Sequence, residues 1–410
     1  MKTWLVNSLL LFALVLVGGA AAAAPVVETV DGVPHVKNGA TPAGGVRSVD
    51  LQEQWRIGGD DEDVLLGIVT RILVDDANNI YLLDQQLSEV QVFGPGGEHL
   101  KTLGRQGDGP GEVNNPGDVV FMPDGTLGLV QVFPGKIVKL TMDGNPAGEF
   151  LPDTGGATAG GFLALVNCRS AGGNLVLSGI RISPNDAGNG QLREYFVRSY
   201  AEDGAQQAHY LGKQSEWVFG PGFKFREIDN DFIWWRMDVG PDGRLVVNEP
   251  RYDYALSVYA PDGTLERVIE REYESWERSD EVYERYVAIM EAQSASFPFP
   301  VEQEVEKMEQ DVGELRIAGD GRIWVLPSRQ MHEPEPGSFA TYDVFTPDGT
   351  FAEQVKVIAP GNPATDRLVF ADDGLAFMVT GFWDAVLSAS AAGEGSDDAT
   401  PMEVICYKVQ

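Results

Sequence analysis

The feature that most constrains the fold is a repeated unit of strands and tight turns. A short apolar strand runs into an Asx-Gly or similar turn, a second apolar strand follows, and a third ends near Phe or Tyr before another such turn. Residues 72–97 form the first copy and residues 119–144 the second. Repetition at about 40 to 50 residues, with hairpins inside each unit, indicates a propeller or solenoid. Because one unit is too small to bury both its faces, the units must stack, and a ring closes the stack.

Two series of turns predict the number of units. Asx-Gly pairs supply the positive φ that tight hairpins need, and their regular two-beat order marks out six units. The first turns are 78–79, 124–125, 172–173, 242–243, 320–321 and 373–374. The second turns are 96–97, 143–144, 203–204, 262–263 and 348–349, and in the sixth unit the long segment 388–400 replaces the second turn.

The last unit predicts how the two ends of the chain meet. It offers only three strands, Arg367 to Phe370, Leu375 to Val379 and Met402 to Val409, whereas the early strand Val49 to Ile57 has no partner near it in sequence. If that strand completes the last unit, it ties the termini together and removes an open sheet edge. We therefore expect an all-β fold, a six-bladed β-propeller over residues 47–410 whose N-terminal strand closes the last blade.

Three insertions interrupt the period and are expected on one face of the disc. Residues 181–193 and 329–340 lengthen hairpins in the third and fifth units, and residues 273–312 form a helical insert between the fourth and fifth. Within the insert, the apolar spacing of Glu281 to Glu291 predicts a helix capped by Ser279 or Asp280. Glu302 to Gln310 is interpreted as a second short helix.

The N-terminus predicts export. Residues 1–24 combine Lys2, an apolar run and small residues in the pattern of a cleaved signal peptide. Residues 25–46, which are rich in Pro, Gly, Ala and Thr, are interpreted as a flexible linker. There is no second long apolar run and no cysteine near the cleavage site. We expect a periplasmic or secreted monomer without a membrane span or lipid anchor.

The net charge limits the classes of binding partner, and the positions of the two cysteines argue against a disulfide. The chain has 30 basic and 62 acidic residues, a formal net charge of −32, which disfavours nucleic acid and anionic lipid as partners. The charge serves solubility or, as the alternative, attracts cations or a basic partner. Cys168 and Cys406 fall in blades on opposite sides of the predicted ring, too far apart for a disulfide, so two buried free thiols are expected.

One known family shares these motifs. Leu103 to Val113 reads LGRQGDGPGEV and is followed by Pro116-Gly117 and a strand, a pattern that resembles the NHL-repeat signature. Ile80 to Asp84 followed by Val90 to Phe93 resembles it too. The chain is similar to exported bacterial six-bladed β-propellers of the NHL type over roughly residues 48–410, without the insert. The resemblance implies a fold but no single activity, since propellers serve as binding platforms and a few are enzymes.

A mixed ring of charges is the first candidate site. Seven residues before the Gly of each first turn, or its equivalent, the chain places residues that should share one level near the start of each inner strand. Arg71 and Asp366 lie beside this ring. It is a candidate site for a charged or zwitterionic ligand, and a structural ion-pair network is the alternative. The ring consists of Ile72, Asp118, Val166, Arg236, Glu314 and Arg367.

An aromatic and polar group is the second candidate site. It combines residue types that often carry binding energy, with packing beneath the helical insert as the alternative. It consists of Trp234, Trp235, Glu249, Arg251, Tyr252, Arg329 and Trp383.

These features favour a binding role. No standard catalytic signature is present, and only four histidines occur, so neither a catalytic residue nor a metal-ligand set is predicted. We expect a non-enzymatic scaffold that recognises a protein, peptide or small ligand on the insertion-bearing face, without a cofactor. The alternative, implied by gluconolactonase-like propellers, is a hydrolase or lyase at the channel mouth. There Asp118 and Glu314 would hold a divalent cation that activates water.

Overall fold

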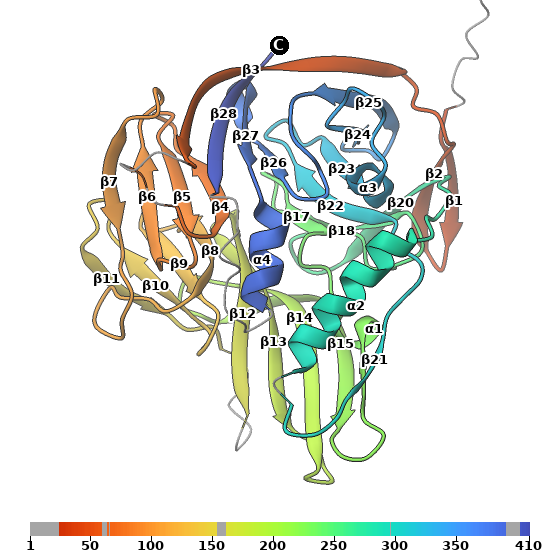
Figure 1. Ribbon diagram of the computed structural model, residues 1–410. Helices are drawn as coiled ribbons and strands as arrows, with labels where there is room; N and C mark the ends of the chain where they lie inside the picture. The colour runs from red at the N-terminus through yellow and green to blue at the C-terminus, as the bar shows by residue number, and fades with distance from the viewer. Residues whose placement is uncertain (1–23, 60–63, 65, 154–160, 296, 391–401) are drawn as a thin grey trace, which may run out of the picture.

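The computed structural model describes residues 24–59, 64, 66–153, 161–295, 297–390 and 402–410. The expected signal peptide, except its last residue, lies outside the described residues. Strands, most of them in antiparallel pairs, make up about half of the described chain, and helices are few (Figure 1).

Three separate four-stranded antiparallel sheets follow one another along the chain. Their tight turns have the positive φ expected from the sequence, 61° at Asn78 and 80° at Gly125. The third sheet has the longest strands because its middle hairpin carries the insertion predicted at 181–193. The strands are β4 (Val69–Val74), β5 (Ile80–Asp84), β6 (Glu89–Phe93) and β7 (His99–Leu103); β8 (Pro116–Phe121), β9 (Leu127–Gln131), β10 (Lys136–Leu140) and β11 (Pro146–Phe150); and β12 (Phe162–Ala171), β13 (Asn174–Pro184), β14 (Gly190–Tyr200) and β15 (Gln206–Val218).

The next sheet corrects one prediction from the sequence. β17 (Met237–Val239), β18 (Leu245–Val247), β19 (Ala255–Tyr259) and β20 (Leu265–Arg271) form a meander, and the hairpin of β1 (Val26–Val30) and β2 (Val33–Asn38) extends it. The linker expected over residues 25–46 is therefore wrong for this hairpin, because β2 pairs in parallel with β20. Asn38 secures the junction: its amide donates to Glu270 O at 3.0 Å and its Oδ1 accepts from Phe351 N at 2.8 Å.

The ends of the chain meet as predicted. β3 (Val46–Gly58) pairs antiparallel with β28 (Glu403–Val409), which confirms that the early strand completes the last meander with β26 (Arg367–Phe370) and β27 (Leu375–Val379). The first part of β3 also pairs in parallel with β25, so one strand joins two meanders (Figure 1). The second of these consists of β22 (Val312–Ile317), β23 (Ile323–Pro327), β24 (Ala340–Phe345) and β25 (Phe351–Ile358).

The helical parts agree with the sequence only in part. α2 (Asp280–Ser294) confirms the predicted helix, and Ser279 Oγ caps it by accepting from Val282 N at 3.3 Å. The second helix is wrong, because Glu302 and its neighbours form a short parallel strand held by Lys224 Nζ, 3.1 Å from Glu302 Oε1. The remaining elements were not predicted: β16 (Lys224–Arg226), α1 (Glu227–Asn230), β21 (Glu302–Glu304), α3 (Ser328–His332), the 3-10 turn η1 (Asp372–Gly374) and α4 (Phe382–Ser390).

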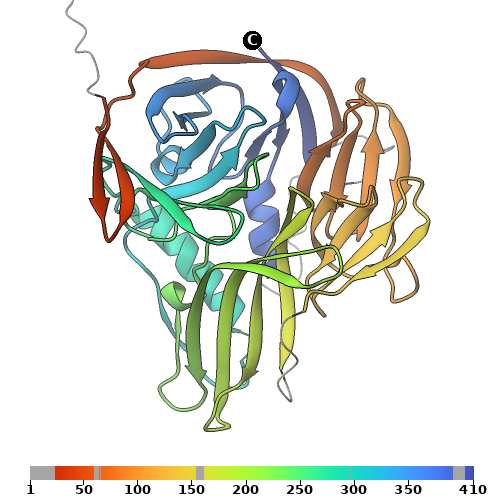
Figure 2. The ribbon, with the colours of Figure 1, turned by 180° about the vertical axis from the view of Figure 1, so that it is seen from behind.

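The first strand of each meander lies toward the middle of the molecule. β8 contacts both β4 and β12, and β17 contacts β12 and β22 (Figures 1 and 2). Apolar clusters fill the spaces between neighbouring sheets, and Cys168 and Cys406 are buried in two different clusters as free thiols, as expected. In the described residues, no helix is both long and apolar enough to cross a membrane.

Candidate functional site

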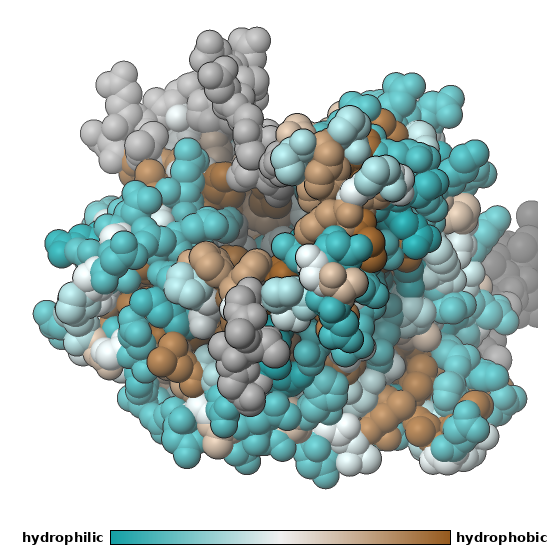
Figure 3. Space-filling model, turned by 90° about the horizontal axis from the view of Figure 1, so that it is seen from below, coloured by the Kyte–Doolittle hydropathy of each residue, from teal (hydrophilic) through white to brown (hydrophobic). Residues whose placement is uncertain are grey.

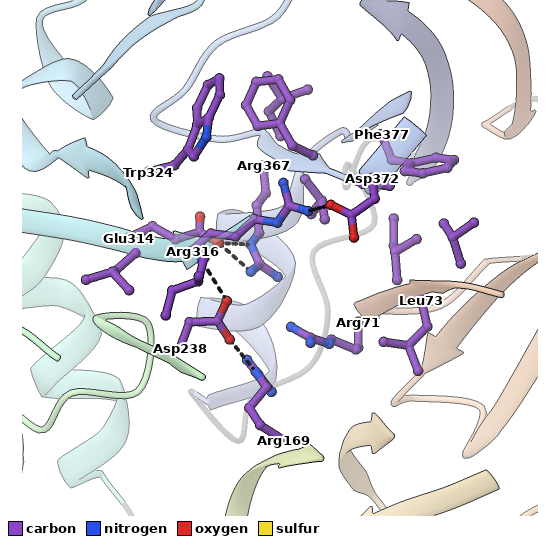
Figure 4. A pocket seen from close by; sticks show the side chains of 18 of the residues that line it. Arg71, Leu73, Arg169, Asp238, Glu314, Arg316, Trp324, Arg367, Asp372 and Phe377 are labelled. Carbon is purple, nitrogen blue, oxygen red and sulfur yellow. Dashed lines mark hydrogen bonds and ion pairs between the residues drawn. The ribbon is translucent and has the colours of Figure 1, made fainter. Parts of the chain in front are cut away.

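A cavity of about 380 Å³ lies between the first strands, in the middle of the molecule. Figure 4 shows four arginines gathered around it from β4, β12, β22 and β26. By contrast, the face of the molecule seen in Figure 3 is mostly hydrophilic, with hydrophobic residues in separate patches. The lining side chains that bear on chemistry are Arg71, Arg169, Trp234, Trp235, Asp238, Glu314, Arg316, Trp324, Tyr342, Arg367, Phe370, Asp372 and Phe377.

β-bulges determine which side chains face this cavity. The pairing register shifts by one residue near the start of β4, β8 and β22, and in the middle of β12. Beyond the bulge, alternate residues face the same side, so Glu314 and Arg316 both line the cavity. In β12 the extra residue is Val166, and Arg169 lines the cavity in place of that expected ring member.

Arg169 joins three sheets. Its Nη1 donates to Asp118 Oδ2 at 2.7 Å, and its Nε donates to Asp238 Oδ1 at 2.9 Å. The same carboxylates accept backbone hydrogen bonds, from Cys168 N and Ile317 N. Burial lowers the pKa of Arg169, but the two carboxylates more than offset this and hold the pKa above its ordinary value. Asp118 and Asp238 are therefore fully engaged.

Arg367 and Glu314 form the second ion pair. Arg367 Nη2 donates to Glu314 Oε1 at 2.5 Å and Nη1 donates to Thr70 O at 3.2 Å. The guanidinium also lies 4.5 Å from the centre of the Trp235 ring, in cation–π geometry. Protein groups thus occupy one face and the edge of the Arg367 guanidinium.

Arg71 and Arg316 differ from the other two. Within the described chain, neither guanidinium donates a hydrogen bond to a protein group; Arg71 Nε lies 3.5 Å from Asp118 Oδ1, and Arg316 Nη2 lies 3.6 Å from Asp372 Oδ1. Burial, with repulsion from Arg169, lowers the pKa of Arg71 to about 10. Burial also lowers the pKa of Arg316. Both side chains are cations with unused donors.

An aromatic wall stands beside Arg316. The ring of Phe370 lies 5.1 Å from that of Trp324 and 5.3 Å from that of Tyr342. Trp324 and Phe370 are only partly buried. In the described chain the Tyr342 hydroxyl makes no hydrogen bond, and burial raises its pKa, so it stays a neutral donor.

α4 packs against Trp235, one of the residues that line the cavity. The Trp235 ring lies 5.8 Å from Phe382 and 5.5 Å from Trp383 between centroids. Arg285 of α2 holds α4 from outside, through a 2.5 Å hydrogen bond to Asp384 Oδ1. Trp383, predicted as a ligand residue, thus belongs to the first turn of α4 and to its aromatic packing.

Several predicted site residues lie elsewhere. Arg236 and Arg251 belong to a buried ion-pair cluster, in which Arg236 bonds Asp231 at 2.8 Å and Arg251 bonds Glu227 at 2.5 Å. Arg236 leaves the expected ring, and Arg251 leaves the expected aromatic and polar group, because α1 and the residue after it bring these carboxylates to them. Arg278 and Glu309 complete that cluster.

The remaining predicted residues make local contacts away from the cavity. Asp366 caps a turn by accepting from Asn362 N and Gly381 N, both at 2.8 Å. The other three bond single partners: Glu249 to Tyr259, Tyr252 to Glu306 and Arg329 to Glu274 O.

The cavity thus unites part of the predicted set and adds to it. Arg71, Trp234, Trp235, Glu314 and Arg367 line it, and Asp118 pairs with its arginines. The sequence count missed Arg169, Asp238, Arg316, Trp324 and Tyr342. Asp238 and Arg316 lie two positions after the ring members Arg236 and Glu314. Because alternate residues of a strand face the same side, extending the count by two residues could have found them.

The acids do not suit a divalent cation. The described residues contain no group of three or more His, Cys, Asp or Glu side chains placed to hold a metal. Asp118 and Glu314, the two acids expected to do so, are each neutralised by an arginine at 2.7 Å or less.

Comparisons with known proteins bear on the fold alone. No protein-family model matches the chain, and no curated protein does. Among solved structures, it is similar to a member of the duf4221 family from Bacteroides vulgatus, with a TM-score of 0.50, 11% identity, and 88% of this chain and 98% of that chain covered. Virginiamycin B lyase from Staphylococcus aureus gives a TM-score of 0.40, 10% identity, and 86% and 98% coverage. The similar structures are propeller-type proteins.

Proposed function

We propose that this protein binds a small organic anion in the central cavity and releases it unchanged. The observation that carries the proposal is the pair Arg71 and Arg316, two cations lining one cavity with donors that no described protein group accepts. Guanidinium groups bind carboxylates and phosphates through paired hydrogen bonds, which both arginines have free to offer.

The pairing of charges inside the cavity supports an anionic ligand. Asp118, Asp238 and Glu314 pair at 2.5–2.9 Å with Arg169 and Arg367, whereas Arg71 and Arg316 lie 3.5 Å and 3.6 Å from Asp118 and Asp372. A buried cation without a hydrogen-bonded partner costs free energy, which an anionic ligand can offset. The lowered pKa of Arg71 reflects this cost. The support comes from these two guanidinium groups and not from the net charge of the lining, since Asp75, Asp76 and Asp372 also line the cavity.

We further infer that the chain is an exported, monomeric, six-bladed propeller of the NHL type. The support for the blade number is the succession of four-stranded meanders and the way β3 joins the last strand to its neighbour. The support for export is the signal-peptide pattern of residues 1–24. In such a ring the cavity is the central channel, and α4 closes one of its ends.

Two measurements test the anion site, the heat of ligand binding by titration calorimetry and the melting temperature of the protein. Benzoate, succinate and inorganic phosphate, with butylamine as the cationic counterpart, are titrated into the purified full chain. We expect the organic anions to bind and raise the melting temperature, and Arg71→Gln to lose about 1.5–3 kcal/mol of that binding. Arg105→Gln is the matched control, because Arg105 is 77% exposed on a loop.

The same titrations separate binding from catalysis. Tighter binding of butylamine than of any anion, or unchanged anion binding by folded Arg71→Gln, would contradict the proposal. A metal-assisted hydrolase or lyase would convert its bound ligand, so the recovered anion is analysed by mass spectrometry after long incubation with and without added divalent cation. Any product would overturn the non-enzymatic role.

A further inference from the structure

We infer that the anion bound in this cavity is an aromatic carboxylate, with its ring against Trp324, Tyr342 and Phe370 and its carboxylate on Arg316. The inference rests on the proposed anion site and narrows its ligand. It follows from the size of the cavity, the make-up of one wall and the state of the polar groups around it.

The size excludes a bare inorganic anion as the occupant that fills the space. The cavity measures about 380 Å³. One water molecule takes about 30 Å³ of liquid, so the cavity is about a dozen waters large. An organic body is needed to displace that water, and a two-ring acid is of the right order of size.

The wall beside Arg316 favours a flat aromatic body. Trp324, Tyr342 and Phe370 lie with ring centres 5.1–6.1 Å apart and at interplanar angles of 40–85°. Trp324 and Phe370 keep part of their surface open. A flat ring placed against them makes offset or edge contacts, which stabilise the complex beyond the effect of simple burial.

The donors next to that wall suit a carboxylate. A ligand carboxylate would compete with Asp372 for Arg316. The Asp372 carboxylate is 3.6 Å away, and its side chain is 68% exposed. Exposed ion pairs of this kind are weak, so a ligand carboxylate can replace it. The unpartnered hydroxyl of Tyr342, raised in pKa by burial, is a second donor on the same wall.

Three carboxylates at the cavity, Asp118, Asp238 and Glu314, are already engaged, and this disfavours a sugar acid or a zwitterion. Such ligands carry hydroxyl or ammonium donors that need free acceptors. Asp118 and Asp238 already accept hydrogen bonds on both oxygens, and Glu314 is neutralised by Arg367. An ammonium group would also face the guanidinium groups of Arg71 and Arg316, which have no hydrogen-bonded partner among the described residues. A ligand whose body has no donors avoids both costs.

The test compares probes that differ in one property each. Isothermal titration uses 2-naphthoate, its saturated decahydro analogue, glucuronate and inorganic phosphate, on the wild type and on Arg316→Gln, Trp324→Leu and Tyr342→Phe. Arg105→Gln and Phe133→Leu are matched controls, since both side chains are exposed on loops. Melting temperature and near-ultraviolet circular dichroism verify that each variant is folded.

We expect 2-naphthoate to bind about 3- to 10-fold more tightly than the decahydro analogue, although the saturated body is the more hydrophobic. Trp324→Leu should remove most of that preference. Arg316→Gln should weaken both carboxylates by about 10- to 100-fold, and the controls should change neither.

Each contrary result identifies which statement fails. If glucuronate, phosphate or the saturated acid binds the wild type as tightly as 2-naphthoate, and Arg316→Gln weakens them all, the aromatic ligand is wrong and the anion site stands. If no anion binds the folded wild type, both are wrong. Because the probe comparison is made on the wild type, a variant that fails to fold does not decide the outcome.

Discussion

Two buried carboxylates, Glu309 and Asp311, show how strongly a residue's neighbours determine its charge. They are two positions apart, and each is 2% exposed. Burial raises the pKa of both, but hydrogen bonds from His332 and Arg278 lower that of Glu309 to about 2. Asp311 has weaker compensation and is repelled by Asp253, so its pKa rises to about 6. One acid therefore stabilises the fold at neutral pH and the other opposes it.

Asp311→Asn should stabilise the protein at high pH. The pKa of Asp311 is about 6 in the folded chain, against about 3.9 in an unfolded one, so the native state binds more protons between these values. The wild type should thus lose free energy of unfolding as the pH rises from about 4 to about 6, and the variant should not. We expect a gain of roughly 1–2 kcal/mol at pH 8 and none at pH 4, measured by urea unfolding.

Glu309→Gln is the counterpart with the opposite sign. The stability from Glu309 is present above its unfolded pKa and is lost as the pH falls toward about 2. We expect a loss of roughly 3 kcal/mol of unfolding free energy at pH 7, because Arg278 loses one of its two carboxylate partners. The loss should shrink at lower pH, where the wild type also loses the contribution of ionised Glu309. Parallel pH profiles of wild type and Asp311→Asn would contradict the assignment of Asp311.

The same dependence on neighbours explains which site residues the sequence could predict. Counting back from turns found Asp118, Glu314 and Arg367, because strand period and turn position are local properties. It placed Val166 in the ring because a bulge leaves no mark in the residue count. It also placed Arg236 there, since the residue count does not show α1, and Asp231 directly after α1 draws Arg236 out of the ring.

At the scale of elements, amino-acid composition predicted the wrong structure for two segments that form strands only because another strand pairs with them. Residues 25–46 have the Pro and Gly content of a linker, yet Asp31 and Gly32, with φ of 52° and 86°, make a hairpin turn that lets β2 reach β20. The edge of β20 is what makes the hairpin stable, and that edge lies more than 200 residues away in sequence. The acid-rich segment after α2 forms β21 for the same reason, because β16 is beside it.

Asn38→Ala tests whether this hairpin is part of the fold. The amide of Asn38 donates to Glu270 O and Gly349 O, and its Oδ1 accepts from Phe351 N. Removing three buried hydrogen bonds should cost about 2–3 kcal/mol of unfolding free energy. Thr29→Ala, on exposed β1, should cost less than about 0.5 kcal/mol. An equal effect of both changes would show that the junction contributes nothing.

For the whole molecule, the decisive element is β3, and the sequence predicted it because an unpaired strand at one end matched a missing strand at the other. What it could not predict is that β3 continues onto β25, so that one strand holds two sheets. Such a strand couples the two ends of the chain, and its removal should expose the edge of β28 that pairs with it.

Cys406 reports on that coupling, with Cys168 as an internal control. Both thiols are buried, and Cys406 pairs across from Trp55 of β3, whereas Cys168 lies in β12. Burial raises the pKa of Cys406 to about 11, so it reacts slowly while the sheet is intact. Deletion of residues 25–45 should leave both thiols protected, because β3 begins at Val46 and stays complete. Deletion of 25–58 should let a thiol reagent label Cys406 at the rate of the urea-unfolded chain, as measured by mass spectrometry. Continued protection of Cys406 after the longer deletion would mean that the ring closes without β3.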